Sequence, residues 1–162
     1  MKIFITSDTH FNHKSMIKEK WRNFDTVKAM NEHIIYQWNR TVGKDDFVIH
    51  LGDVFIGKKE EGMKNIIPKL NGKIFLIKGN HDKGLQEINV KASVICYKGL
   101  DIELVHNPQD ASGKYKYVIH GHLHQHNMKF TKKPKLKYYN VNIELHKYRP
   151  KLLNEIIGEM KK

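Results

Sequence analysis

Short apolar runs recur along this chain, and most of them are followed at once by aspartate, glycine or histidine. Runs of about five residues rich in Ile, Val, Leu, Phe and Tyr predict buried strands. The predicted strands are Lys2–Ser7, Phe47–Leu51, Lys73–Lys78, Ser93–Tyr97, Leu100–Val105, Tyr117–His120 and a segment near Tyr138–Glu144. The turn at Lys98-Gly99 predicts that the two strands beside it pair with each other.

A different period lies between the first two strands, where apolar residues recur at helical spacing. They are Val27, Met30, Ile34, Ile35 and Trp38. This spacing predicts a helix that buries one face. We expect Asn23 or Asp25 to cap its start, and we expect it to run to about Val42 with Gly43 as its stop.

Two further segments predict helices. Lys58–Leu70 is one, with an early end at Pro68, and a segment near Pro150–Met160 is the other. Residues 107–116 predict a polar loop. Alternating strands and helices followed by several strands indicate a mixed α/β layered fold. A chain of 162 residues fits one domain, 1–162, whose core needs neither disulfides nor a structural metal.

Composition excludes several classes of protein. An apolar fraction of 40% with 28% charged residues is typical of a globular chain and not of a disordered one. No apolar run approaches the roughly 20 residues of a membrane span, and the first residues lack the apolar core of a signal peptide. Cys96 is the one cysteine, so no intrachain disulfide can form. We therefore expect a cytoplasmic protein in a reducing compartment, with no membrane partner.

The charge is unbalanced, because 29 lysines and arginines face 17 acidic residues and give a net charge of +12. A field of this sign attracts phosphate groups. Phosphate esters and nucleic acid are therefore the candidate partners. The eleven histidines are the second unusual feature of the composition.

Five predicted strands end in short polar signatures. These are Asp8-Thr9-His10, Gly52-Asp53, Gly79-Asn80-His81-Asp82, His106 and Gly121-His122-Leu123-His124. Ligand sites of open α/β sheets gather outside the carboxyl ends of the strands. Carboxylate, imidazole and amide groups together suit divalent metals of borderline hardness. No thiolate is offered, which excludes a cysteine-type structural zinc site.

The spacing of these residues indicates how many ions they could hold. In an extended segment Asp8 and His10 point to the same side, provided that Thr9 points away. His122 and His124 share a side too and could serve two adjacent ions. Seven candidate donors are too many for one ion that keeps water, and they fit two ions sharing a carboxylate. The seven are Asp8, His10, Asp53, Asn80, His106, His122 and His124.

These motifs resemble, in order and spacing, the calcineurin-like metallophosphoesterases, and most closely the short members of bacteria and phages that lack a cap domain. The resemblance includes an extended opening, Ser7–His13, and a closing Asn140–Glu144 followed by Tyr148-Arg149-Pro150. It implies a four-layer αββα sandwich of two mixed sheets. For a phage-encoded member, the expected compartment is the host cytoplasm.

The resemblance also implies a role for each site residue. Asp8, His10 and His124 would bind a first metal, Asn80, His106 and His122 a second, and Asp53 would bridge them. His81 would contact substrate and protonate the leaving oxygen, and Asp82 would orient His81. Manganese is the favoured metal, with iron, zinc, nickel or magnesium as alternatives, and a metal-bridging hydroxide would attack the phosphate.

Residues around this set carry open alternatives. His13 could hold a ligand, touch substrate or be a packed loop histidine. Asn12 could touch substrate, and His126 could reach phosphate or be exposed to solvent. The segment Lys129–Lys137, with five lysines in nine residues, could be a basic rim for a polyanion in which Phe130 stacks a base. It could equally be a solvated hairpin loop whose lysines prevent edge pairing.

Three functions follow from this interpretation. The first is a metal-dependent phosphoesterase that hydrolyses mono- or diesters, with small nucleotide-like diesters favoured. The second is a nuclease or a phosphatase that processes nucleic-acid ends, which the basic charge favours. The third is a binding scaffold of the same fold with a dead site, which the complete donor set disfavours.

Overall fold

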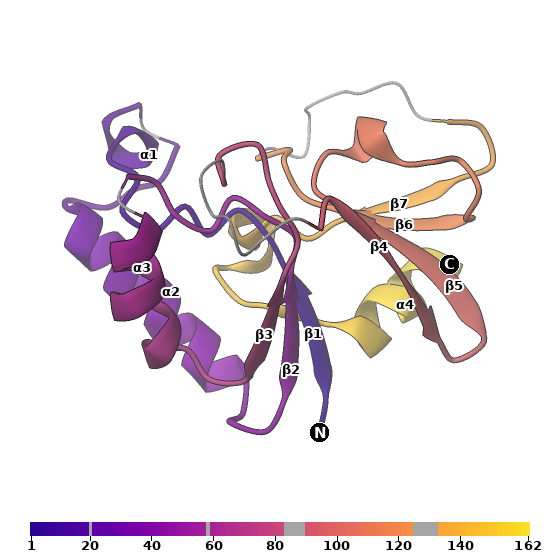
Figure 1. The fold of residues 1–162 in the computed structure, drawn as a ribbon, viewed down its shortest axis with the longest axis horizontal. Coiled ribbons are helices and arrows are strands. Elements are labelled where there is room, and N and C mark those ends of the chain that lie inside the picture. The colour runs from indigo at the N-terminus through magenta and orange to yellow at the C-terminus, as the bar shows by residue number, and fades with distance from the viewer. Residues whose placement is uncertain (20, 58, 83–89, 125–132) are drawn as a thin grey trace.

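The protein folds into two four-stranded sheets with helices around them (Figure 1). A computed structural model describes residues 1–19, 21–57, 59–82, 90–124 and 133–162. Both sheets mix parallel and antiparallel pairs. The predicted mixed α/β class with two mixed sheets is confirmed.

The first sheet has the order β3-β2-β1-β8. Strands β1 (Ile3–Thr6), β2 (Phe47–His50) and β3 (Lys73–Leu76) are parallel. The short strand β8 (Lys151–Leu152) adds an antiparallel edge to β1. Because the three parallel strands end at one edge of the sheet, the polar residues that follow them meet there.

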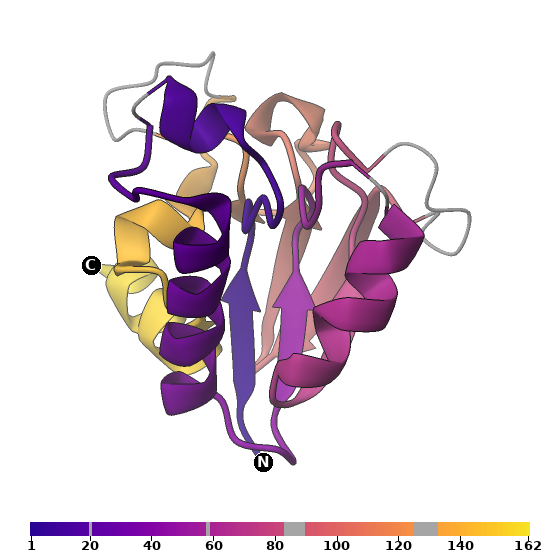
Figure 2. The same ribbon diagram turned by 90° about the vertical axis from the view of Figure 1, so that its left-hand side faces the viewer.

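Two helices cover one face of this sheet, α2 (Val27–Thr41) and α3 (Lys59–Asn65), as Figure 2 shows. The predicted cap of α2 is wrong. Thr26 is extended and its hydroxyl accepts the Ala29 N–H at 3.0 Å, so the helix starts later than an Asn23 or Asp25 cap requires. The helix ends because Val42 is extended, and Gly43 does not adopt a left-handed conformation.

The early end of the second predicted helix is confirmed. After α3 the chain continues as a 3-10 turn, Ile67–Lys69, which contains Pro68. A helix that was not predicted, α1 (Ser15–Lys18), lies in the connection between β1 and α2. It is too short for apolar periodicity to reveal it.

The second sheet has the order β4-β5-β6-β7. Its strands are β4 (Ala92–Tyr97), β5 (Leu100–Val105), β6 (Tyr117–His120) and β7 (Lys137–Asn140). The last strand begins and ends earlier than predicted, because the side chain of Asn142 caps a 3-10 turn, Ile143–His146, where the strand was expected to continue. The predicted polar loop contains a second 3-10 turn, Pro108–Asp110.

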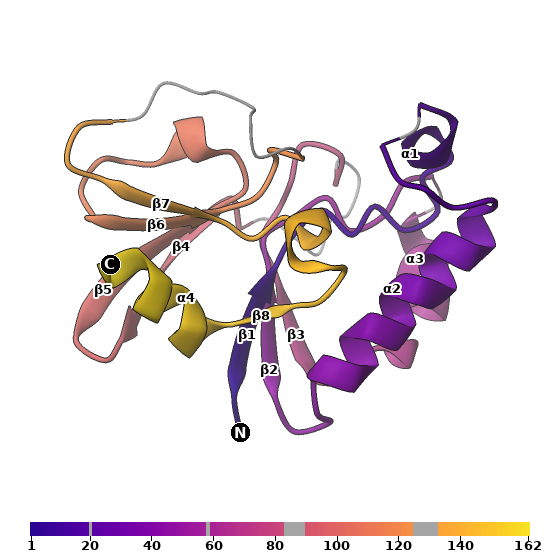
Figure 3. The ribbon, with the colours of Figure 1, turned by 180° about the vertical axis from the view of Figure 1, so that it is seen from behind.

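One core cluster lies between the sheets and is closed by the C-terminal helix α4 (Leu153–Lys161), which contacts β1 and β7 (Figure 3). A separate cluster packs α2 and α3 on the first sheet. A smaller one, Val105, Ala111 and Val118, lies on the second sheet. Among the described residues, no helix is both long and apolar enough to cross a membrane.

Candidate metal centre

Three loops meet at the carboxyl ends of the strands at very short range. The Asp8 N–H donates to the Gly52 carbonyl at 2.9 Å, and the His10 N–H donates to the Asp53 carbonyl at 3.0 Å. A Cβ on Gly52 would overlap the backbone of Gly79. Glycine is therefore required where these loops cross.

The backbone at this edge is strained. Asp8, His10, Asn12, Asp53 and His122 all have positive φ, between 48° and 69°. Non-glycine residues in this region cost free energy and cluster where the surrounding structure enforces them. The extended geometry predicted for Asp8 and His10 is thus wrong, although Thr9 does point away, with its hydroxyl donating to the Val54 carbonyl at 3.1 Å.

Asp8, His10 and His124 form one group that could hold a metal ion. The Asp8 Oδ1 atom lies 3.9 Å from both His10 Nε2 and His124 Nε2. All three side chains are buried or half-buried. They come from the ends of β1 and β6, so the two sheets jointly build this group.

A second such group consists of Asp53, His106 and His122. Asn80 adds a fourth donor, since its Oδ1 lies 2.8 Å from His106 Nε2 and 3.0 Å from His122 Nδ1. The Asp53 Oδ2 atom lies 3.4 Å from His106 Nε2 in this group and 3.7 Å from His10 Nε2 in the first. Asp53 therefore stands between the two groups.

The donor atoms fit metal ions better than they fit one another. Asp8 Oδ1 and His10 Nε2 are buried and have no hydrogen-bond partner among the described residues. Burying such atoms unpaired is unfavourable, and a cation would satisfy both. Atoms that bind one ion at about 2.0–2.2 Å are themselves about 3–3.5 Å apart, close to the separations observed.

The far nitrogen of each of three histidines is already engaged. His10 Nδ1 lies 3.2 Å from His13 Nδ1, His106 Nδ1 lies 2.8 Å from the Leu51 carbonyl, and His124 Nδ1 lies 3.1 Å from Glu144 Oε2. When the ring is neutral, a proton held on Nδ1 leaves the Nε2 lone pair directed into the site. This arrangement is typical of histidines that bind metals.

The sequence matches the family model of calcineurin-like phosphoesterases over residues 1–156. The chain belongs to the calcineurin-like phosphoesterase family.

The chain is also similar to individual proteins. The phosphoesterase chain is 38% identical to an uncharacterized protein of Methanocaldococcus jannaschii over 99% of this chain and 92% of that protein. A crystal structure of a protein of unknown function from Aquifex aeolicus superposes with a TM-score of 0.80 at 23% identity, covering 98% of each chain. A novel archaeal phosphodiesterase matches at a TM-score of 0.43 and 25% identity, over 86% of this chain and 82% of that one.

Asp82 of this calcineurin-like phosphoesterase has other partners than the resemblance implies. Its buried carboxylate accepts the backbone N–H groups of Asp53 at 2.6 Å, Val54 at 3.1 Å and Gly79 at 2.8 Å. The expected role of Asp82 in orienting the His81 ring stays a prediction. Asp82 joins two loops and holds Asp53 in place.

His81 lies at the open side of the site. Its backbone N–H donates to Asp53 Oδ1 at 2.8 Å, and its ring is exposed, 5.4 Å from the His10 ring between centroids. This position leaves the imidazole beside the donor atoms rather than among them.

Burial and neighbouring charges set the protonation of the site. Burial opposes charge on His106, but the hydrogen bond to Asp53 and the Asp8 and Asp53 charges outweigh it and raise its pKa to about 9. Burial lowers the pKa of His10 to about 2, and burial raises the pKa of the Asp8 carboxyl. The metal-free site thus carries a proton on His106 that a metal must displace.

Sequence reasoning missed a buried arginine beneath the first group. Arg22 is 1% exposed and donates to the carbonyls of Asp8 at 2.6 Å and Thr9 at 2.7 Å. It also pairs with Glu144 at 2.6 Å, and Glu144 reaches His124. The resemblance had marked Glu144, but nothing local in the sequence around Arg22 indicates a site residue.

The flanking candidates have separate outcomes. His13 contacts His10, as described above, whereas the Asn12 side chain accepts from Asn31 Nδ2 on α2 at 2.7 Å. His126 and residues 129–132 lie outside the described residues. From the rest of the lysine segment, Lys133 Nζ donates to the Ala111 carbonyl, and Lys137 Nζ donates to the Met160 carbonyl at 2.7 Å.

Proposed function

We propose that this calcineurin-like phosphoesterase hydrolyses phosphodiesters of small nucleotide-like molecules with two divalent cations, manganese first among them. The observation that carries the proposal is the position of Asp53 between two donor groups. Its Oδ2 atom lies within 3.7 Å of a histidine nitrogen in each group, which suits a carboxylate shared by two ions.

The residues of the site have separate roles. Asp8, His10 and His124 would hold one ion, and Asn80, His106 and His122 the other, with Asp53 shared between them. Two bound ions would activate water and neutralise the phosphoryl charge. Arg22 and Glu144 keep Asp8 and His124 in place from below.

His81 is our candidate for the general acid. Hydrolysis adds water across a P–O bond, so phosphorus gains a hydroxyl oxygen and the departing oxygen needs a proton. The exposed His81 ring is close enough to the donor groups to supply it, and no contact of its ring with the Asp82 carboxylate is needed.

Nucleic acid is a second candidate substrate, and the net charge of +12 favours it. A polyanion bound through several lysines loses affinity steeply with salt, whereas a small ester does not. A salt titration of binding therefore separates the two. The prediction of a cytoplasmic compartment, and that of a single domain over 1–162, stay predictions.

The test measures metal content and turnover together. Protein reconstituted with Mn²⁺ should bind close to two ions per chain and hydrolyse bis-p-nitrophenyl phosphate faster than p-nitrophenyl phosphate. Faster cleavage of the monoester would overturn the diester preference. Two bound ions without hydrolysis of any ester would instead favour the binding scaffold.

A further inference from the structure

The two flanks of the metal centre have different chemistry. On the side of the Asp8 group an exposed indole stands at the rim, and on the side of the Asp53 group lysines line a hollow. Neither feature is needed to hold ions. Both would contact whatever extends beyond the phosphate in the site.

Trp21 is the exposed aromatic of the first flank. Its side chain is 42% exposed, and its ring centroid lies 5.7 Å from that of His124, edge to face. The next residue, Arg22, is the buried arginine bound to the carbonyls of Asp8 and Thr9. The position of Trp21 is thus fixed by the same contacts that build the first donor group.

An exposed aromatic ring beside a ligand site offers an apolar face, and a ligand that covers this face removes it from water. Bases stack on such rings regardless of their sequence. The only hydrogen bond of the indole to a described residue goes from Nε1 to Glu19 Oε2 at 3.3 Å, in the plane of the ring. That contact holds the ring without using its face.

The second flank is a hollow of about 390 Å³ that reaches the second donor group. His106, His122 and Asn80 form one wall, and Lys78 and Lys91 form part of another. The Lys78 N–H donates to the Val90 carbonyl at 2.8 Å, which keeps the two lysines on neighbouring segments.

The charge of this hollow favours an anion. Among the described residues that line it, Asp110 is the one acidic side chain outside the donor groups. Neither lysine ammonium forms an ion pair with a described residue. Two unpaired ammonium groups beside a phosphate site suit a second phosphate.

We propose that the site recognises a phosphodiester with a nucleobase stacked on Trp21 and a second phosphate beside Lys78 and Lys91. A dinucleotide that carries a terminal phosphate has both features. The inference rests on the proposed phosphodiesterase function and names its substrate class.

Stacking of a base on Trp21 is tested with thymidylyl-thymidine and its abasic analogue, in which both bases are absent. Trp21→Ala should lower kcat/KM for the dinucleotide about 5- to 150-fold more than for the abasic analogue, the usual range for one stacked base. Trp21→Phe should restore most of this preference. The matched control is Tyr36→Ala, which removes an aromatic that is 57% exposed on α2 and should leave the ratio of the two substrates unchanged.

The second phosphate is tested by adding a 5′-phosphate to the same dinucleotide. The wild-type protein should prefer the phosphorylated form, and Lys78→Gln with Lys91→Gln should remove about tenfold of that preference. Lys44→Gln, an exposed lysine in the turn before β2, is the control. An equal loss of kcat/KM for both dinucleotides would overturn the proposal that a second phosphate binds beside Lys78 and Lys91.

Fluorescence supplies a readout that needs no turnover. Trp38 is fully buried, so quenching by a bound nucleotide reports on Trp21. In metal-free protein, AMP should quench and ribose 5-phosphate should not, and Trp21→Leu should abolish the difference. If the protein hydrolyses diesters but shows neither a base preference nor quenching of Trp21 by AMP, this inference alone is overturned. If AMP quenches Trp21 but no ester is hydrolysed, the proposed function alone is overturned.

Discussion

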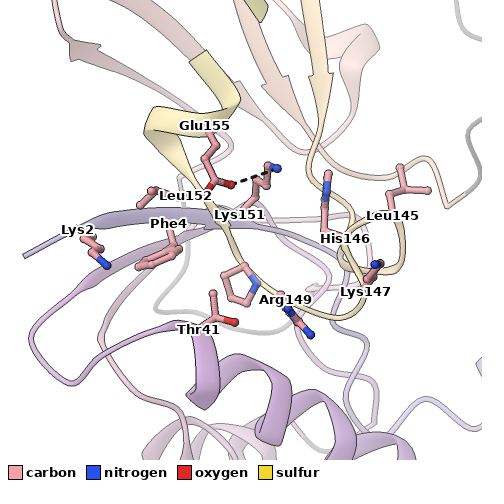
Figure 4. Close-up of a pocket in the computed structure, with 11 residues that line it drawn as sticks. Lys2, Phe4, Thr41, Leu145, His146, Lys147, Arg149, Lys151, Leu152 and Glu155 are labelled. Carbon is pink, nitrogen blue, oxygen red and sulfur yellow. Dashed lines mark ion pairs between the residues drawn. The ribbon is translucent and has the colours of Figure 1, made fainter. Parts of the chain in front are cut away.

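The hollow drawn in Figure 4 and the hollow beside the metal centre have similar volumes, about 480 and 390 Å³, and both carry basic side chains. Their polar groups differ in how they are satisfied. In the first, Lys151 pairs with Glu155 at 3.2 Å and with Glu159 at 2.8 Å, and Arg149 donates to Gln37 at 3.1 Å. The second borders the Asp53 group of the metal centre, and the neighbouring Asp8 group contains the buried Asp8 Oδ1 and His10 Nε2 atoms, which have no partner among the described residues.

Volume and positive charge therefore do not distinguish a metal site on this molecule, whereas unsatisfied buried donors do. Backbone strain alone does not distinguish it either. Lys147, which lines the hollow of Figure 4, has φ of 56°, as extreme as the residues of the metal centre.

The largest effect is expected from Asp53→Asn. The amide keeps the shape of the side chain but loses the charge that stands between the two donor groups. Both ions should be lost from dialysed protein and turnover should become undetectable, which elemental analysis and a diester assay measure. Retention of two ions with normal activity would show that Asp53 is not shared.

His81→Ala should leave both ions bound and lower turnover roughly 10²- to 10⁴-fold, the usual contribution of a general acid. The loss should be large for nucleoside esters, whose alkoxide needs a proton, and small for nitrophenyl esters.

Asp82→Asn should behave differently, because Asp82 holds the backbone of Asp53 and Gly79. It should lower stability and metal content, and it should therefore lower turnover on all substrates alike.

Glu144→Gln tests the support under the first donor group. The amide can still meet Arg22 or His124, but the charge between them is gone, and metal affinity should fall roughly 10- to 100-fold. Arg22→Lys should be more damaging to folding, since one ammonium cannot replace the contacts with Asp8, Thr9 and Glu144. Breaking a buried pair of this kind costs about 3–5 kcal/mol, which thermal denaturation would detect.

The sequence indicated the candidate donors but not the residues that support them. Asp8, Asp53 and His106 lie within a few residues of the ends of apolar runs, so strand ends alone predicted them at one edge. The contact of Arg22 with Glu144 joins residues 122 positions apart, and no local pattern encodes it. The left-handed backbone at Asp8 and His122 is equally hidden, because neighbouring loops impose it against the residues' own preference.

The pH dependence should follow His106. Its pKa in the metal-free fold is about 9, above the value of ~6.5 for an unperturbed histidine. Its pairing with Asp53 therefore stabilises the metal-free protein fully below about pH 6.5, and this stability is lost as the pH rises through about 9. Metal binding needs the neutral ring, so metal affinity should rise by up to about tenfold per pH unit from 6.5 to 9. An affinity that is flat over this range would contradict the assignment of His106 as a donor.

The smallest effect is expected at the hollow of Figure 4, where the left-handed Lys147 ends the 3-10 turn Ile143–His146. A left-handed residue with a Cβ costs about 1–2 kcal/mol, whereas glycine costs roughly 0.5–1 kcal/mol in unfolded-chain entropy. Lys147→Gly should therefore stabilise the protein by up to about 1 kcal/mol, a rise in Tm of roughly 2–4 °C. Metal content and turnover should not change. Lys147→Ala keeps the strain while removing the charge, so it should give no stabilisation. If alanine stabilises as much as glycine, charge repulsion rather than backbone strain is being relieved, and the two hollows differ less in their electrostatics than their ion pairs indicate.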